Sequence, residues 1–85
     1  MKFDIAVQTV NTLKSEPTNE EKLLVYGWFK QATIGDNLTE KPSMFYFKET
    51  AKWNAWSNCK GTSASSAKSK YIDLVIALYN KYGVQ

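Results

Sequence analysis

The stretch YGWFKQATIG, residues 26–35, sets the pattern for the rest of the chain, because it places a phenol and an ammonium four residues apart. In a helix, Tyr26 and Lys30 point the same way at this spacing. Leu23 lies one turn before Tyr26, so the same face begins with an apolar side chain. This face suits a ligand that has an apolar end and an anionic end.

Sequence signals mark both ends of this helix. Pro17 prevents a preceding helix from continuing, and Thr18 with Glu21 three residues later matches a capping box. Gly35 is well placed to end the helix in a left-handed conformation. We therefore expect this second helix of the chain to span residues 19–34.

A first helix is indicated upstream by apolar residues that recur at intervals of three and four. This is the period of an amphipathic helix, which we expect over about residues 3–14. Its polar face carries Asp4 and Gln8, among others. The apolar stripe comprises Phe3, Ala6, Val7, Val10 and Leu13.

The residues between Gly35 and Phe47 break any helical period and predict a loop of about a dozen residues, longer than most connections in compact domains. Loops of this length are often functional or packed on themselves. Met44, Phe45 and Phe47 favour the second interpretation. We expect these three side chains to form an apolar plug beneath the loop.

A third helix is predicted over residues 48–58, where helical spacing returns. Trp53 and Trp56 are three residues apart, whereas Lys48 and Lys52 are four apart on a different face. The simplest interpretation of each lysine is a solvated surface charge, and that of each tryptophan is a place in the core. The two faces of this short helix therefore differ in character.

The fourth predicted helix is the longest. It begins after Gly61 with Thr62 or Ser63 as its N-cap, and Gly83 ends it after Tyr82. No convincing alternating pattern predicts a strand anywhere. The fold class is therefore all-α with four helices. The apolar stripe of the last helix comprises Ala67, Tyr71, Ile72, Leu74, Val75 and Leu78.

Composition is typical of one folded domain spanning residues 1–85. Hydrophobic residues make up 44% of the chain and aromatic residues 14%, which is enough for one modest core. Cys59 is the only cysteine, so no intrachain disulfide can form, and we expect it to be a small buried or half-buried filler. We see no signal peptide and no membrane span. We therefore expect a cytoplasmic monomer without stable membrane insertion.

The residue types present argue against catalysis. Without histidine, the chain lacks the usual acid–base group and the common nucleophile pairs. One cysteine and no histidine exclude the common zinc sites, and no glycine-rich nucleotide motif is present. We expect no enzymatic activity, no metal and no cofactor.

The charge balance favours small anionic ligands or acidic surfaces. The net charge is +3, with eleven lysines and no arginine. Lysine binds phosphate as a point charge but lacks the guanidinium fork that distinguishes base edges. We therefore do not expect a nucleic-acid partner.

Taken together, three segments closely resemble the acyl-CoA-binding protein family: YGWFKQATIGD at residues 26–36, FKETAKWNAW at 47–56, and KGTS at 60–63 with YID at 71–73. The resemblance runs through essentially the whole chain. It implies a four-helix, up-down-down-up bundle. It also implies an intracellular carrier and buffer that binds one long-chain fatty acyl-CoA ester per monomer.

The resemblance further implies a binding site for the CoA head group on the second, third and fourth helices. The implied acyl-CoA-binding residues are Tyr26, Lys30, Lys48, Lys52 and Tyr71. A groove between the second and third helices would bury the acyl tail, since each methylene contributes about 0.8 kcal/mol. The implied groove or flanking contacts are Asn11, Lys22, Leu23 and Phe29.

Three positions depart from the family pattern. Lys22 stands where the family usually has an apolar residue, although a lysine can bury its stem and keep its ammonium in water. Asn11 replaces a basic residue, and Glu16 places an acid where lysine is common. Exposed charges at a distance are screened, so we expect weaker binding but not its loss.

Two alternatives remain open from the residues alone. One is a small helical interaction module that docks a peptide or partner helix through exposed aromatics such as Trp28, Tyr46 and Tyr79. The other is a nucleic-acid binder that uses the lysine excess. A steep salt dependence with DNA would favour the second alternative.

Overall fold

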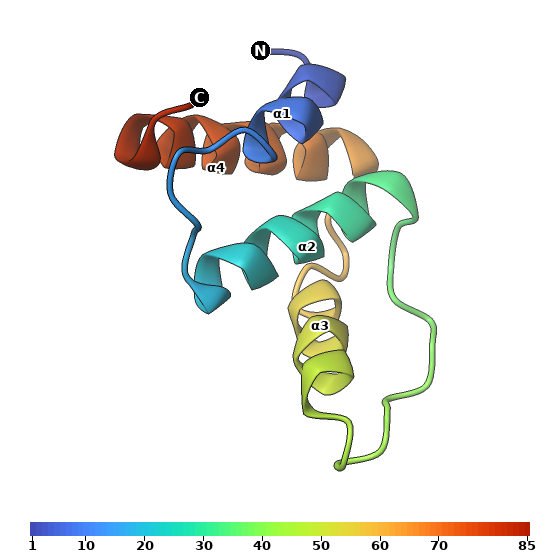
Figure 1. The fold of residues 1–85 in the computed structure, drawn as a ribbon. Helices are drawn as coiled ribbons and strands as arrows, with labels where there is room; N and C mark the ends of the chain where they lie inside the picture. Colours follow the sequence, from blue (N-terminus) through green and yellow to red (C-terminus); the bar gives the residue numbers. More distant parts are fainter.

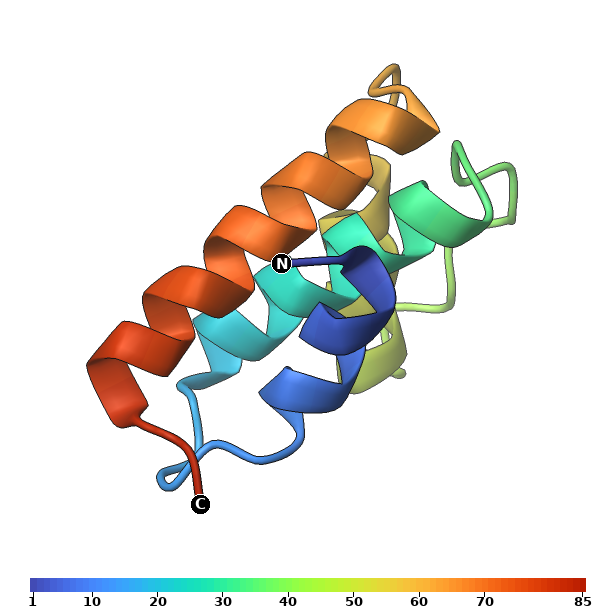
Figure 2. The same ribbon diagram turned by 90° about the horizontal axis from the view of Figure 1, so that it is seen from above.

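The computed structural model describes residues 1–85 and confirms the all-α fold with four helices (Figure 1). The central helix is α2, which packs against both α3 and α4, while α1 packs against α4. Figure 2 shows α1 and α4 on the near side of the molecule and α3 behind them. None of the four combines the length and apolarity of a membrane span. The bounds are Phe3–Val10 for α1, Asn19–Thr33 for α2, Phe47–Ser57 for α3 and Ala64–Tyr82 for α4.

The ends of α2 follow their sequence signals. The Thr18 hydroxyl accepts a hydrogen bond from the Glu21 N–H (3.2 Å), and the Glu21 carboxylate accepts one from the Thr18 N–H (2.8 Å). At the other end, Gly35 has a φ of +99°, a conformation that a side chain would strain. Its N–H donates to the Lys30 carbonyl (3.3 Å). The predicted cap and stop of α2 are both confirmed.

Helix α1 ends at Val10, so the expected limit at residue 14 is wrong. The side chains that follow bond to nearby backbone carbonyls and compete with the helix. The Asn11 amide donates to the Val7 carbonyl (3.2 Å), and the Thr12 hydroxyl donates to the Thr9 carbonyl (2.8 Å). The chain therefore leaves the helical path one turn early.

The segment after α1 runs alongside the C-terminal residues. The Lys14 N–H donates to the Gly83 carbonyl (3.0 Å), and Leu13 forms an isolated antiparallel bridge with Val84. Leu13 thus lies outside the helix whose apolar stripe it was expected to complete. This bridge ties the end of α1 to the end of α4.

The core lies where α1, α2 and α4 meet. Ala6, Tyr71 and Val75 are buried, and the Tyr71 ring lies 5.0 Å from the Phe3 ring and 6.1 Å from the Phe29 ring, measured between centroids. Helices α1 and α4 therefore pack directly against each other. The partly buried residues around this cluster are Phe3, Val7, Val10, Val25, Trp28, Phe29 and Ile72.

The expected apolar plug beneath the α2–α3 loop is absent. Met44, Phe45 and Phe47 are 75%, 80% and 80% exposed. The physical reason is visible in Figure 1, where α3 extends away from the other helices and begins at its far end. At this far end no helix covers these three side chains, so they stay exposed.

Hydrogen bonds to α3 hold this loop instead. The Trp53 indole N–H donates to the Thr39 carbonyl (3.1 Å), and the Trp56 indole N–H donates to the Gly35 carbonyl (2.7 Å). Asn37 is buried, and its amide donates to α3 as well. The expected core position is confirmed for Trp56, which is 7% exposed, but is wrong for Trp53, which is only partly buried.

Candidate functional site

A groove of about 500 Å³ lies between α2 and α3. Its walls combine apolar side chains with polar ones that carry an ammonium or a phenol. Each helix supplies apolar side chains and at least one lysine. A groove with one apolar part and several cationic groups can hold an amphipathic anion. The residues that line it are Asn19, Lys22, Leu23 and Tyr26 on α2, with Phe47, Lys48, Ala51 and Lys52 on α3.

Three of the five implied head-group residues meet in this groove. Lys52 reaches from α3 to α2, where its ammonium lies 4.9 Å from the centroid of the Tyr26 ring. This is a cation–π distance, so the contact orients the lysine across the groove. Lys48 lies one turn earlier on α3 and lines the same space. The expected juxtaposition of Tyr26, Lys48 and Lys52 is therefore found.

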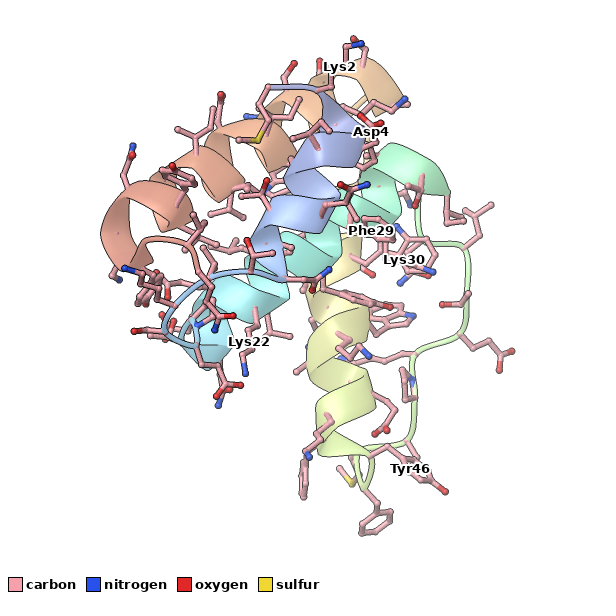
Figure 3. All side chains as sticks on the ribbon, turned by 45° about the horizontal axis from the view of Figure 1, so that its top comes forward. Lys2, Asp4, Lys22, Phe29, Lys30 and Tyr46 are labelled. Atoms are coloured by element: carbon pink, nitrogen blue, oxygen red, sulfur yellow. The ribbon has the colours of Figure 1, made fainter.

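Lys30 lies one turn beyond Tyr26 on α2, but it does not line the groove itself. Its ammonium lies 4.8 Å from the centroid of the Trp56 ring on α3. Figure 3 shows Lys30 near the C-terminal end of α2 and Lys22 near its N-terminal end. The cationic groups thus extend along α2 beyond the groove.

Two of the three departures from the family pattern neutralise each other. The Lys22 ammonium forms an ion pair with the Glu16 carboxylate. The hydrogen bond from Lys22 lowers the pKa of Glu16 below its usual value. The aliphatic stem of Lys22 lines the groove, while its ammonium lies outside and pairs with Glu16. A lysine can divide its side chain in this way between an apolar surface and a polar one.

The remaining expected site residues lie away from the groove. Tyr71 is 2% exposed, and burial raises the pKa of its phenol. Phe29 stacks on Phe3 with 6.2 Å between ring centroids and contacts Tyr71 in the core. Asn11 is exposed at the end of α1. The structure therefore places Tyr71 and Phe29 in the α1–α2–α4 contact.

Gly27 was given no role from the sequence, yet it determines how closely α2 and α3 approach. A Cβ atom at this position would lie 2.5 Å from the carbonyl oxygen of Ala55, which is a backbone atom. Any side chain would therefore force α3 away from α2, next to Tyr26. The signal was present, because a glycine inside a helix is about 1 kcal/mol less favourable than alanine and calls for a packing reason.

A second groove of about 520 Å³ borders the first between the same two helices. The two grooves share Leu23 and Ala51 in their linings. Cys59 lies in the second groove and is buried, and burial raises the pKa of its thiol. The expected buried position of Cys59 is confirmed.

Comparisons with curated proteins support one family. Residues 1–75 match the family model described as acyl CoA binding protein. Acyl-CoA-binding protein homolog 1 of Caenorhabditis elegans is 49% identical over 83 residues, which covers 98% of this chain and 96% of that protein. The acyl-CoA-binding protein of Saccharomyces cerevisiae is 45% identical over 80 residues, covering 94% and 92%.

Solved structures agree with this result. The crystal structure of Oryza sativa acyl-CoA-binding protein 2 matches with a TM-score of 0.89 and 38% identity, over 93% of this chain and 88% of that one. The solution structure of the yeast acyl coenzyme A binding protein matches with a TM-score of 0.74 and 44% identity, over 95% and 94%. The four-helix fold implied by the sequence resemblance is thereby confirmed. The chain belongs to the acyl-CoA-binding protein family.

Proposed function

We propose that residues 1–85 form one domain that binds long-chain fatty acyl-CoA esters, one per monomer, and serves as their carrier and buffer. The observation that carries this proposal is the α2–α3 groove. Its cationic wall, with Lys48 and Lys52 beside Tyr26, adjoins the apolar side chain of Leu23. A fatty acyl-CoA ester has the matching order of parts, a phosphorylated head joined to an apolar tail.

The head group binds through charge. Lys48 and Lys52 direct ammonium groups to the CoA phosphates, and Tyr26 supplies a hydroxyl between them. Each charge-assisted hydrogen bond of this kind contributes about 1.5–3 kcal/mol. Lys30 adds a third ammonium one turn along α2, where its contact with Trp56 restrains it.

The nucleotide end of the ligand lies over the aromatic part of the core. The Tyr71 and Phe29 rings meet there in a tilted arrangement, with ring centroids 6.1 Å apart. The resemblance assigns a nucleotide contact to Tyr71; because only 2% of Tyr71 is exposed, its larger role is to pack the core beneath the nucleotide, where Phe29 supports its ring from α2. Asn11, at the end of α1, flanks this region with a neutral amide, so it adds no charge to the site.

The acyl tail makes the site selective for esters over free CoA. Burial of each methylene contributes about 0.8 kcal/mol, so a covered long tail rivals the head group in binding energy. Leu23 and Ala51 line both grooves and supply apolar surface for the tail. The stem of Lys22 lines the first of these grooves.

The carrier acts without chemistry of its own. It hides the tail from water and releases the ester by mass action when the free concentration falls. The chain's one thiol is a free, buried cysteine, which suits the reducing cytoplasm. We place the protein there as a monomeric, non-enzymatic buffer.

Isothermal titration tests this function. Palmitoyl-CoA, octanoyl-CoA, free CoA and palmitate are compared at one salt concentration, below the micelle concentration of the longest ester. We expect palmitoyl-CoA to bind one-to-one and far more tightly than free CoA or palmitate. Equal affinities for free CoA and its esters would show that no tail site exists, and no binding of any of the four would refute the proposal.

A further inference from the structure

Four consecutive side chains at the start of α3 form an exposed apolar surface, which we call the aromatic tip: Met44, Phe45, Tyr46 and Phe47. Their exposed fractions are 75%, 80%, 60% and 80%. Figure 1 places this turn at the far end of α3, and Figure 3 shows Tyr46 pointing outward from it. Contiguous exposed apolar surface of this kind marks a site of interaction with a protein or a membrane.

Part of the backbone of the tip is paired by hydrogen bonds within the turn. The Tyr46 N–H donates to the Ser43 carbonyl (2.9 Å), and the Thr50 N–H donates to the Tyr46 carbonyl (2.9 Å). The Thr50 hydroxyl also donates to the Ser43 carbonyl (3.4 Å). A projecting turn with these groups paired can enter the edge of a bilayer with fewer polar groups left unsatisfied. It projects and offers no concave surface for a partner helix.

The charge around the tip is weakly positive. Residues 40–52 contain three lysines and two acids, Glu40 and Glu49, which leaves one net positive charge in a chain of net charge +3. Lys41 and Lys48 flank the tip on either side and are both exposed. This combination of aromatic side chains with flanking lysines matches a surface of lipid tails covered by anionic head groups.

The tip is continuous with the groove between α2 and α3. Phe47 belongs to the tip and also lines the groove, and Lys48 follows it in the groove wall. A surface that meets the tip therefore also meets the α3 side of the groove. An acyl chain could pass there between a bilayer and the groove with little exposure to water.

We propose that the aromatic tip docks the protein reversibly on a lipid bilayer with anionic head groups, and that the acyl chain of the ligand enters or leaves the groove at that contact. The second half of this statement rests on the proposed function. The docking itself does not, because it depends on the exposed tip and its flanking lysines alone.

Vesicle co-sedimentation without any acyl-CoA tests the docking. Vesicles of phosphatidylcholine mixed with phosphatidylserine are compared with vesicles of phosphatidylcholine alone. Phe45→Ser should weaken binding by about tenfold, because it removes the apolar area that enters the interface. Tyr79→Ser, a matched change on α4 at a residue 43% exposed, should leave binding unchanged. Phe45 and Tyr79 both lie outside the groove lining.

Lys41→Gln separates the electrostatic contribution from the apolar one. It should weaken binding to the anionic vesicles by about fivefold and leave binding to phosphatidylcholine alone unchanged. Absence of vesicle binding by the unmodified protein would refute the docking, as would equal binding by Phe45→Ser. The docking is also refuted if Phe45→Ser instead abolishes self-association in sedimentation without vesicles, since the tip would then be a contact between two copies.

Transfer kinetics test the second half of the proposal. Palmitoyl-CoA is loaded into the anionic vesicles, and its arrival on the protein is followed over time. Phe45→Ser should slow the transfer about tenfold while its affinity in solution stays unchanged, because Phe45 does not line the groove. Equal transfer rates would refute entry at the tip. If the unmodified protein docks but fails to bind palmitoyl-CoA in solution, the proposed function is wrong and the docking stands.

Discussion

The α1–α2–α4 core and the α2–α3 groove are held together in different ways. The core is built from buried apolar and aromatic side chains around Tyr71, whereas α3 packs against α2 alone and approaches its backbone at Gly27. The core therefore carries most of the stability, and the groove keeps an open, solvated wall. This division allows side chains in the groove to be changed for binding without unfolding the protein.

The largest expected effect is on the core. Tyr71→Ala should lower the free energy of unfolding by about 3–5 kcal/mol, because it empties a buried site against Phe3 and Phe29. Urea unfolding measures this loss. Tyr71→Phe keeps the ring and should lose much less stability. A comparable loss in both variants would mean that the hydroxyl, rather than ring packing, holds the core together.

Gly27→Ala should lower both the stability of the protein and its affinity for ligand, although the two properties otherwise depend on different regions. The added Cβ meets the Ala55 carbonyl oxygen, so α3 must move, and we expect a loss of about 1–3 kcal/mol in stability. Affinity for palmitoyl-CoA should fall with it, because the groove widens beside Tyr26. Urea unfolding and titration calorimetry are run on the same sample. Helix propensity alone would make Gly27→Ala more stable. A gain in stability would therefore contradict the close approach of α3 to Gly27.

Lys52→Ala should affect binding in the groove without affecting the stability of the core. It leaves a ligand phosphate without its partner, so the dissociation constant for palmitoyl-CoA should rise about tenfold or more while the unfolding midpoint stays the same. Lys70→Ala on α4 is the matched control, since the Lys70 ammonium also lies over an aromatic ring, 5.4 Å from the centroid of Trp28. An equal loss of affinity in both variants would show that overall charge, and not the groove, decides binding.

Lys22→Met should have a smaller effect of opposite sign. It replaces a lysine stem in the groove by an apolar side chain and frees Glu16 from its ion pair. We expect the affinity for palmitoyl-CoA to rise about threefold, as the added apolar contact predicts, with no change for free CoA. Titration of both ligands measures this, and an equal gain for both would place Lys22 near the head group instead.

The smallest expected effect is a pH dependence of stability at the N-terminus of α2. Hydrogen bonds from Tyr82, from the Thr18 backbone and from Lys81 lower the pKa of Glu21 from 4.5 to about 2. The folded protein thus favours the carboxylate, so this stabilisation is complete above about pH 4.5 and is lost as the pH falls toward 2. Solvent screening keeps the effect small. In Glu21→Gln, the urea unfolding midpoint should depend less on pH across this range than in the unmodified protein. The same pH dependence in both proteins would contradict the prediction.

The site was partly predictable because its residues lie on regular helices. Tyr26, Lys48 and Lys52 were expected from the resemblance, and the structure brings them together in one groove. Gly27 was missed, since a helical glycine indicates a close approach without naming the partner. The exposed aromatic tip was misjudged as a plug, because hydrophobic residues in a loop do not reveal whether another element lies behind them.

Local physics determined the helices from the sequence by itself. The capping box at Thr18, the left-handed stop at Gly35 and the apolar periods each depend on neighbours within a few residues, so the pattern alone predicts them. Only the tertiary structure decided the crossing of α2 and α3 at Gly27 and the exposure of the tip. These features depend on which distant segments meet in space, and periodicity within one segment carries no information about that.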